Sequence, residues 1–262
     1  MRSLRFAHRV LSAATLSLGL VASATVAAAG TTTVNAPSYG GELSVSDILS
    51  GVYGEAFSAS GDNFTSTSFS AIRIDDFGIG GPLSTTGAQG SADDKVWDGE
   101  FAKASARGRY AGYDQSFGYI DGASGGIYHN LFDTVGYGLS PSVTGEAVDI
   151  NAIGQFRLAR NGQNGVFSSL ETDNLDGLDH MVTYQIQGLA DASNFVTWMV
   201  FFEDLNMIQG GEHAQWSDRD FNDLAVELKA AAVPLPPAAL MGLVGLAVPM
   251  GMNVAKRYRR KA

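Results

Sequence analysis

The sequence predicts a single all-β domain, a β-sandwich of the jelly-roll type, flanked by an apolar segment at each end. Three observations lead to this fold class. Short apolar or alternating runs recur along the chain, turn-forming residues separate them, and long helical periodicity is absent. The 262 residues include 32 glycines, which suit frequent turns. Many short strands with turns at such intervals are typical of sandwiches.

The sandwich is expected to occupy residues 42–230, and nine runs within it are expected to form strands. These runs are Glu42–Leu49, Ser66–Ile74, Lys95–Ala104, Tyr110–Ile120, Gly126–Val135, Val148–Leu158, Met181–Gln187, Phe195–Phe202 and Leu224–Leu228. Dipeptides in which glycine follows Asn or Asp are expected to form turns, because they adopt positive φ at little cost. They are Asp121-Gly122, Asn161-Gly162, Asn164-Gly165 and Asp176-Gly177.

The N-terminal segment has the pattern of an export signal. Three arginines are followed by an apolar run over residues 10–26, and Ala27 and Ala29 close it in an A-x-A arrangement. This pattern predicts a signal peptide over residues 1–29, cleaved after Ala29, and a flexible lead-in over residues 30–41.

The C-terminal segment predicts a second membrane signal in three parts. Residues 231–237 are rich in proline, which favours an extended backbone. Residues 238–255 are apolar, and a helix of eighteen residues is about 27 Å long, close to the roughly 30 Å core of a bilayer. Residues 256–262 are basic and are expected to stay in the cytoplasm. The segment therefore predicts a transmembrane helix with a cytoplasmic tail.

This three-part tail resembles the PEP-CTERM class of protein-sorting signals, with Leu235 where the usual tripeptide has Glu. The motif residues are Val233, Pro234, Leu235, Pro236 and Pro237. The resemblance implies a Gram-negative-type bacterium that makes exopolysaccharide, and processing by an exosortase-like membrane protease. It also implies delivery to the cell surface or extracellular matrix. Two outcomes stay open, since the inner-membrane anchor is either transient or retained.

Charge and cysteine content limit the function of the region between the ends. Eight of the 17 basic residues lie in the two ends and none of the 27 acidic residues does, so the remainder carries a formal charge of −18 (9 − 27). Such a surface repels nucleic acid and attracts cations. The chain has no cysteine, which excludes disulfides, thiol catalysis and thiolate metal sites.

Oxygen-bearing side chains gather in two segments near the end of the domain. They are Asp218, Asp220, Asn222 and Asp223, together with Glu203 and Asp204 at the end of the preceding strand. Oxygen ligands at this density suit calcium, which takes six to eight of them. The spacing is not that of an EF-hand, because Asp223 stands where the loop needs Gly. The alternative is a hydrogen-bonded turn in which Arg219 neutralises one carboxylate.

These segments also resemble a domain of uncharacterised function common in bacterial surface proteins that carry such tails. The resemblance rests on an Asp179-His180 element before a strand, on Phe202-Glu203-Asp204, and on the D-x-D-F-N-D-L run from Asp218. It implies a β-sandwich and calcium ligands at Asp218, Asp220, Asn222 and Asp223. His180 is expected to be a hydrogen-bonding residue at the start of a strand, since no second His or Cys supplies zinc spacing.

Aromatic residues provide a second candidate site. Flat rings can stack on the apolar faces of sugars, which makes a carbohydrate-binding surface possible, although aromatic residues are more often core. The candidates are Trp97, Tyr113, Phe117 and Tyr119.

The sequence predicts a non-enzymatic function. Nothing in it resembles a nucleophile elbow, a phosphate-binding loop or a zinc-protease helix. We therefore expect an exported structural or adhesive protein, stabilised by calcium and associated with the cell envelope or matrix and with exopolysaccharide. The alternatives are a carbohydrate-binding module that retains exopolysaccharide and, third, a polysaccharide-active enzyme.

Overall fold

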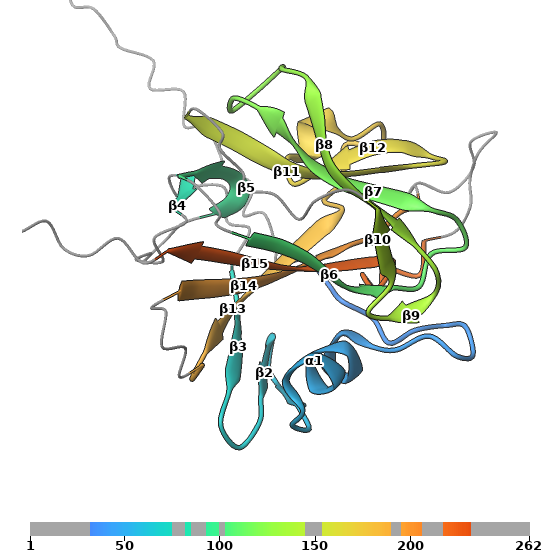
Figure 1. Ribbon diagram of the computed structural model, residues 1–262, viewed down its shortest axis with the longest axis vertical. Coiled ribbons are helices and arrows are strands. Elements are labelled where there is room, and N and C mark those ends of the chain that lie inside the picture. The colour runs from blue at the N-terminus through green and yellow to red at the C-terminus, as the bar shows by residue number, and fades with distance from the viewer. Residues whose placement is uncertain are drawn as a thin grey trace, which may run out of the picture.

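The computed structural model describes residues 32–74, 82–84, 93–99, 103–144, 154–189, 195–205 and 217–231. In these ranges the chain forms two stacked β-sheets and one α-helix, which confirms the predicted all-β, sandwich-like architecture (Figure 1). The predicted signal peptide, sorting motif, transmembrane helix and basic tail all lie outside these ranges. Within them, no helix has the length and apolar character needed to cross a bilayer.

The first sheet has eight strands, and the last part of the chain forms its centre. Its order is β1 (Ser58–Ser60), β2 (Asn63–Thr65), β3 (Ser70–Arg73), β13 (Met181–Gln187), β14 (Phe195–Phe202), β15 (Leu224–Ala231), β6 (Lys103–Arg109) and β9 (Gly138–Leu139). All neighbouring pairs in this sheet are antiparallel.

The second sheet has seven strands and packs across the first. Its order is β10 (Ser142–Thr144), β8 (Tyr128–Val135), β7 (Gln115–Asp121), β11 (Gln155–Gly162), β5 (Asp93–Asp98) and β4 (Pro82–Ser84), and β12 (Gly165–Ser168) pairs with β11. A single 3₁₀ turn, η1 (Glu171–Asp173), follows β12 within the described residues.

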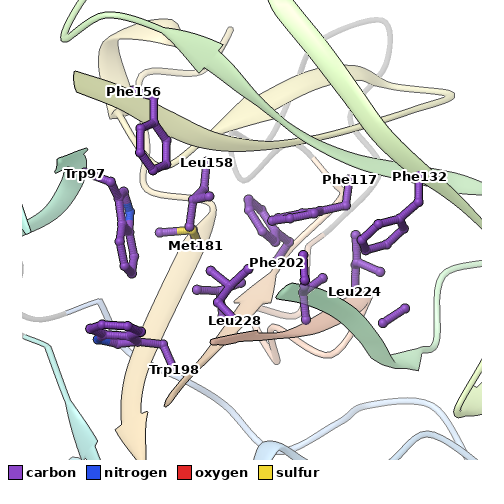
Figure 2. Close-up of a cluster of buried hydrophobic side chains, with 14 of the residues drawn as sticks. Trp97, Phe117, Phe132, Phe156, Leu158, Met181, Trp198, Phe202, Leu224 and Leu228 are labelled. Carbon is purple, nitrogen blue, oxygen red and sulfur yellow. The ribbon is translucent and has the colours of Figure 1, made fainter. Parts of the chain in front are cut away.

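The main core fills the space between the two sheets (Figure 2). Alternate residues of β14, among them Trp198 and Phe202, point toward the second sheet and meet Phe117, Phe156 and Leu158 there. Trp97 of β5 and Trp198 of β14 pack edge to face, with ring centroids 5.8 Å apart. These side chains are fully buried, so the core holds the sheets together by burial of large aromatic surface.

A second apolar cluster covers the opposite face of the first sheet. Helix α1 (Val45–Tyr53) buries Val45, Ile48 and Leu49 against residues of β14 that include Met199 and Phe201. Figure 1 shows α1 on the side of the first sheet that faces away from the second. Strand β14 is therefore buried on both faces, which explains why its sequence is apolar at every position except Thr197 and does not alternate.

The predicted strand Glu42–Leu49 is wrong, because this segment leads into α1. Ser44 and Asp47 form a capping box: the Asp47 amide donates to the Ser44 hydroxyl (3.2 Å), and the Ser44 amide donates to the Asp47 carboxylate (3.3 Å). Gly54 ends the helix in the left-handed conformation, with φ 74°. The capping residues at the two ends thus favour a helix, although the apolar residues between them also suit a strand.

The other predicted strands agree with the structure to different degrees. Both Met181–Gln187 and Phe195–Phe202 match β13 and β14 at each end. The run Lys95–Ala104 is divided between β5 and β6, and Asn161-Gly162 belongs to strand β11 and not to a turn. The turn itself is Gln163-Asn164, because Gly162 pairs with Gly165.

Candidate metal centre

The first group of acidic residues forms where β14 ends and β15 begins. The two strands are antiparallel and Phe202 lies opposite Leu224, so Glu203 and Asp204 emerge beside Asp223. The Asp204 amide donates to Asp223 Oδ2 at 2.8 Å. One carboxylate oxygen from each of the three residues lies within 4.8 Å of the others. We call Glu203, Asp204 and Asp223 the inner trio.

Glu203 and Asp204 of the inner trio are buried and Asp223 is half-buried, and only part of the hydrogen-bonding capacity of the trio is used. Gln115 Nε2 donates to Asp204 Oδ2 at 2.6 Å, and the Leu205 amide donates to Glu203 Oε1 at 3.3 Å. Glu203 is 1% exposed. Its second oxygen, Oε2, is buried and has no hydrogen-bond partner among the described residues. A buried carboxylate oxygen without a donor is costly unless a cation or water satisfies it.

A second group of acidic residues lies next to the first. Glu42, Asp218 and Asp220 also place one carboxylate oxygen each within 4.8 Å of the others, and we call them the outer trio. Asp220 is 1% exposed, and Asn222 holds both of its oxygens through the backbone amide (3.2 Å) and the side-chain amide (2.7 Å). Asn222, predicted as a ligand, thus positions the carboxylate of Asp220.

The segment that carries the outer trio has an unusual backbone. Arg219 and Phe221, on either side of Asp220, both have positive φ, 58° and 55°. Such a conformation is uncommon for non-glycine residues and costs on the order of 1–3 kcal/mol per residue. Phe221 is fully buried in the α1 cluster, which compensates for the strain. Packing of α1 therefore helps to fix the loop that presents Asp218 and Asp220.

The two trios act as one electrostatic unit. Burial raises the pKa of Glu203, and the charges of Asp204 and Asp218 raise it further. Burial, followed by the charge of Asp218, raises the pKa of Asp220 to about 8. For Asp223, burial and the carboxylates of Asp204 and Glu203 raise the pKa well above its usual range. The folded protein thus holds these carboxylates close together at a substantial electrostatic cost.

One buried cation lies beside the inner trio among the described residues. Arg160 is fully buried, and its Nη2 donates to the backbone carbonyl oxygen of Asp204 at 2.8 Å. Its charge lowers the pKa of Asp204, against the larger effect of burial. With all six carboxyl groups ionised, as cation ligands would be, the two trios and Arg160 carry a formal charge of −5 (1 − 6). Arg160 alone does not neutralise the two trios, which together we call the acidic constellation.

In the alternative to a calcium site, a hydrogen-bonded turn, the sequence predicts that Arg219, and not Arg160, neutralises one carboxylate. Arg219 is exposed, and its backbone carbonyl accepts a hydrogen bond from the Asn35 amide at 2.8 Å. A solvent-exposed guanidinium is screened by water and salt, so it contributes little to charge balance in a buried site.

A buried stack of rings lies next to the inner trio and contacts the backbone of Glu203. His180 stacks on Phe167 with ring centroids 3.9 Å apart, and the Arg160 guanidinium lies 4.2 Å from the centre of the same Phe167 ring. His180 Nδ1 lies 3.2 Å from the Glu203 carbonyl oxygen, and Nε2 lies 3.0 Å from Asp176 Oδ2. The prediction of a hydrogen-bonding histidine before a strand is confirmed.

The donor set fits a hard divalent cation. All six acidic residues offer carboxylate oxygens, and neither trio contains His or Cys, which disfavours zinc. Carboxylate oxygens are the ligands that calcium prefers, and its six to eight ligands in flexible geometry tolerate carboxylates at mixed depth. The structure brings together all six residues predicted from sequence, five of them in the trios and Asn222 hydrogen-bonded to Asp220, and it adds Glu42. Sequence spacing gives no signal for Glu42, because its contacts come from the tertiary fold.

The aromatic residues proposed for sugar binding do not form a surface. Trp97 and Phe117 are fully buried between the sheets, so neither ring can present a face to a ligand. The core placement, which the sequence favours for such residues, is confirmed for these two, and the sugar-binding alternative does not hold for them. Tyr113 and Tyr119 are half-buried, and Tyr113 accepts a hydrogen bond from Asn164 Nδ2 at 2.5 Å beside the inner trio. Trp97 and Phe117 lie in the core because burial of a large aromatic area is strongly favourable.

Comparison with known proteins gives one match over part of the chain, and that match carries no activity. Residues 144–231 match the profile of a family described as "Domain of unknown function (DUF4114)". The matched segment contains β11 to β15 and five of the six acidic residues, whereas Glu42 and strands β5 to β8 precede it. No curated protein and no solved structure matches the chain.

Proposed function

We propose that this chain is an exported β-sandwich protein with a structural or adhesive role, stabilised by calcium at its acidic constellation. The observation that carries the cation-binding part is the inner trio. Three carboxylates meet at the junction of β14 and β15, and the buried Oε2 atom of Glu203 has no hydrogen-bond partner within the described ranges. A cation would satisfy this oxygen and relieve the repulsion among the three charges.

Calcium at this point would stabilise the centre of the sandwich. Strands β14 and β15 are neighbours at the middle of the first sheet, and both contribute to the two apolar clusters. A cation held by Glu203, Asp204 and Asp223 would join the end of one strand to the start of the next. Without disulfides, an exported domain gains from such a cross-link.

The location of the protein is proposed from its two ends. The signal-peptide pattern of residues 1–29 supports export, and the Val233–Pro237 motif with the apolar run 238–255 supports sorting by an exosortase-like protease. We place the mature protein at the cell envelope, cell surface or exopolysaccharide-containing matrix. We also propose jelly-roll connectivity, since the chain crosses repeatedly between the two sheets.

A non-enzymatic role agrees best with these features. The acidic groups lie against each other at a strand junction, and the carbohydrate alternative loses Trp97 and Phe117 to the core. We therefore propose that any association with exopolysaccharide does not use an aromatic platform built on those two residues.

Calorimetric titration of the full chain, purified in mild detergent, tests the cation site. We expect saturable calcium binding that magnesium reproduces only weakly, because magnesium requires tighter octahedral geometry. Glu203→Gln should weaken binding at least tenfold. Asp62→Asn is the matched control, because Asp62 is exposed in the β1–β2 turn, remote from the trios in sequence. Absence of calcium binding by the wild-type chain would refute the proposal.

A further inference from the structure

The segment that precedes α1 lies along the loop that carries the outer trio. The Asn35 amide and side chain donate to the carbonyl oxygens of Arg219 (2.8 Å) and Asp218 (2.6 Å). Farther along, Asn222 Nδ2 donates to the carbonyl oxygen of Leu43 at 3.1 Å. We call residues 32–44 the N-terminal strap. The strap is thus held to residues 217–223 by a few hydrogen bonds, several of which lie at the exposed surface.

The strap supplies an acidic residue at the point where it meets the loop. Glu42 lies with Asp218 and Asp220, and burial and the charge of Asp218 raise its pKa. Ser38 also donates its backbone amide to Asp218 Oδ2 at 3.3 Å. Without a cation, the Glu42 carboxylate is repelled by the very loop to which the strap is attached. The strap therefore combines attractive hydrogen bonds with an unfavourable charge contact.

The two trios are close enough to interact but are built from different parts of the chain. The inner trio belongs entirely to the β14–β15 junction, whereas the outer trio joins that junction to the strap. Glu203, 99% buried and with an unpartnered oxygen, interacts electrostatically with Asp218, Asp220 and Glu42. With all six carboxyl groups ionised, one divalent cation would reduce the formal charge from −5 to −3, and a second would reduce it to −1.

From this arrangement we infer that the outer trio is a second calcium site, which latches the N-terminal strap and α1 onto the sandwich. This inference rests on the proposed calcium binding at the inner trio. With the outer calcium bound, Glu42 changes from a repelled charge to a shared ligand, and the strap closes on residues 217–223. Calcium concentration then controls how firmly α1 covers the apolar outer face of the first sheet.

The latch makes a specific prediction about amide hydrogen exchange in the full chain. Raising calcium from a chelated to a saturating level should slow exchange in residues 33–44 and in α1 at least tenfold, while amides of β8 in the second sheet stay unchanged. Calorimetry should give two calcium ions per chain. Glu42→Gln should bind one, and its strap should exchange at the same rate with and without calcium.

Two variants separate this inference from the proposed function. Asp62→Asn, which removes a remote charge, should bind two calcium ions and protect the strap as the wild type does. If Glu42→Gln still binds two calcium ions, or if wild-type binding leaves strap exchange unchanged, the latch is overturned while the inner site stands. If the wild-type chain binds no calcium, the proposed function fails together with the latch.

Discussion

The pKa values of individual carboxyl groups in this protein depend strongly on burial and on neighbouring charges. Asp220 shows this most clearly, since its oxygens accept two hydrogen bonds from Asn222 and its pKa is still raised to about 8 by burial and by Asp218. A carboxyl group whose pKa rises on folding binds a proton more tightly in the folded state. Protonation and cation binding therefore compete for the same site.

This competition predicts the pH dependence of stability without metal. The stabilising effect of the Asp220 proton is fully present below the unfolded pKa of about 3.9 and is lost as pH rises toward the folded value. In chelator, the melting temperature should be lower at pH 8 than at pH 5 by roughly 5 °C or more. In Asp220→Asn the difference between the two pH values should shrink. Equal pH dependence in the two proteins would show that Asp220 does not carry the effect.

The buried histidine provides a second prediction for a single residue. His180 places both ring nitrogens near acceptors, the Asp176 carboxylate and the Glu203 carbonyl oxygen. Asp176→Asn keeps the volume but replaces a carboxylate with an amide, so we expect a loss of about 1–3 kcal/mol in the free energy of unfolding. Denaturant unfolding measures it, and unchanged stability would argue against a structural role for this pair.

At the scale of elements, glycine makes close strand contacts possible. A Cβ atom on Gly118 of β7 would lie 1.9 Å from the carbonyl oxygen of His129 in β8, at a register shift between Phe117 and Gly118. Gly118→Ala should therefore force the pair apart and destabilise the protein by about 2 kcal/mol or more. Gly112→Ala is the matched control, because its Cβ would meet nothing within 4 Å. Thermal unfolding of both variants tests the contact, and equal melting temperatures would contradict it.

Helix α1 depends on its N-cap residue, Ser44. The Ser44 hydroxyl accepts from the Asp47 amide, so Ser44→Ala should cost about 1 kcal/mol. Because α1 covers the outer face of the first sheet and packs on Phe221, this loss should also accelerate exchange of α1 amides. Unchanged exchange in Ser44→Ala would show that packing alone holds the helix.

Elements differ in how well sequence alone could locate them. Strands β13 and β14 were predictable because β13 alternates between apolar and polar residues and β14 is a compact, largely apolar run. In contrast, α1 was not, because Val45, Ile48 and Leu49 suit either a helix or a strand until the capping residues are weighed. Strands of two to four residues, such as β1 and β9, carry too little pattern to be recognised.

At the scale of the whole molecule, the sequence predicted the sandwich and most residues of the candidate site. It did not predict the residues that distant parts of the chain bring to that site. The β14–β15 junction is local enough that Glu203, Asp204 and Asp223 could be grouped from the order of the strands. Glu42 and Arg160 reach the same place only through tertiary packing. Sequence alone also could not show that Trp97 and Phe117 lie in the core, because buried and exposed aromatic residues look alike in a sequence.

Thermal unfolding of the full chain at pH 8, in chelator and at rising calcium, tests whether calcium stabilises the folded protein. We expect the melting temperature to rise steadily with the logarithm of calcium concentration, because calcium binds the folded state and not the unfolded chain. A hundredfold excess over the dissociation constant should add about 2.7 kcal/mol, and Glu203→Gln should lose most of this gain. A wild-type melting temperature that is independent of calcium would show that no calcium binds the folded state, and would leave the acidic constellation as a hydrogen-bonded turn.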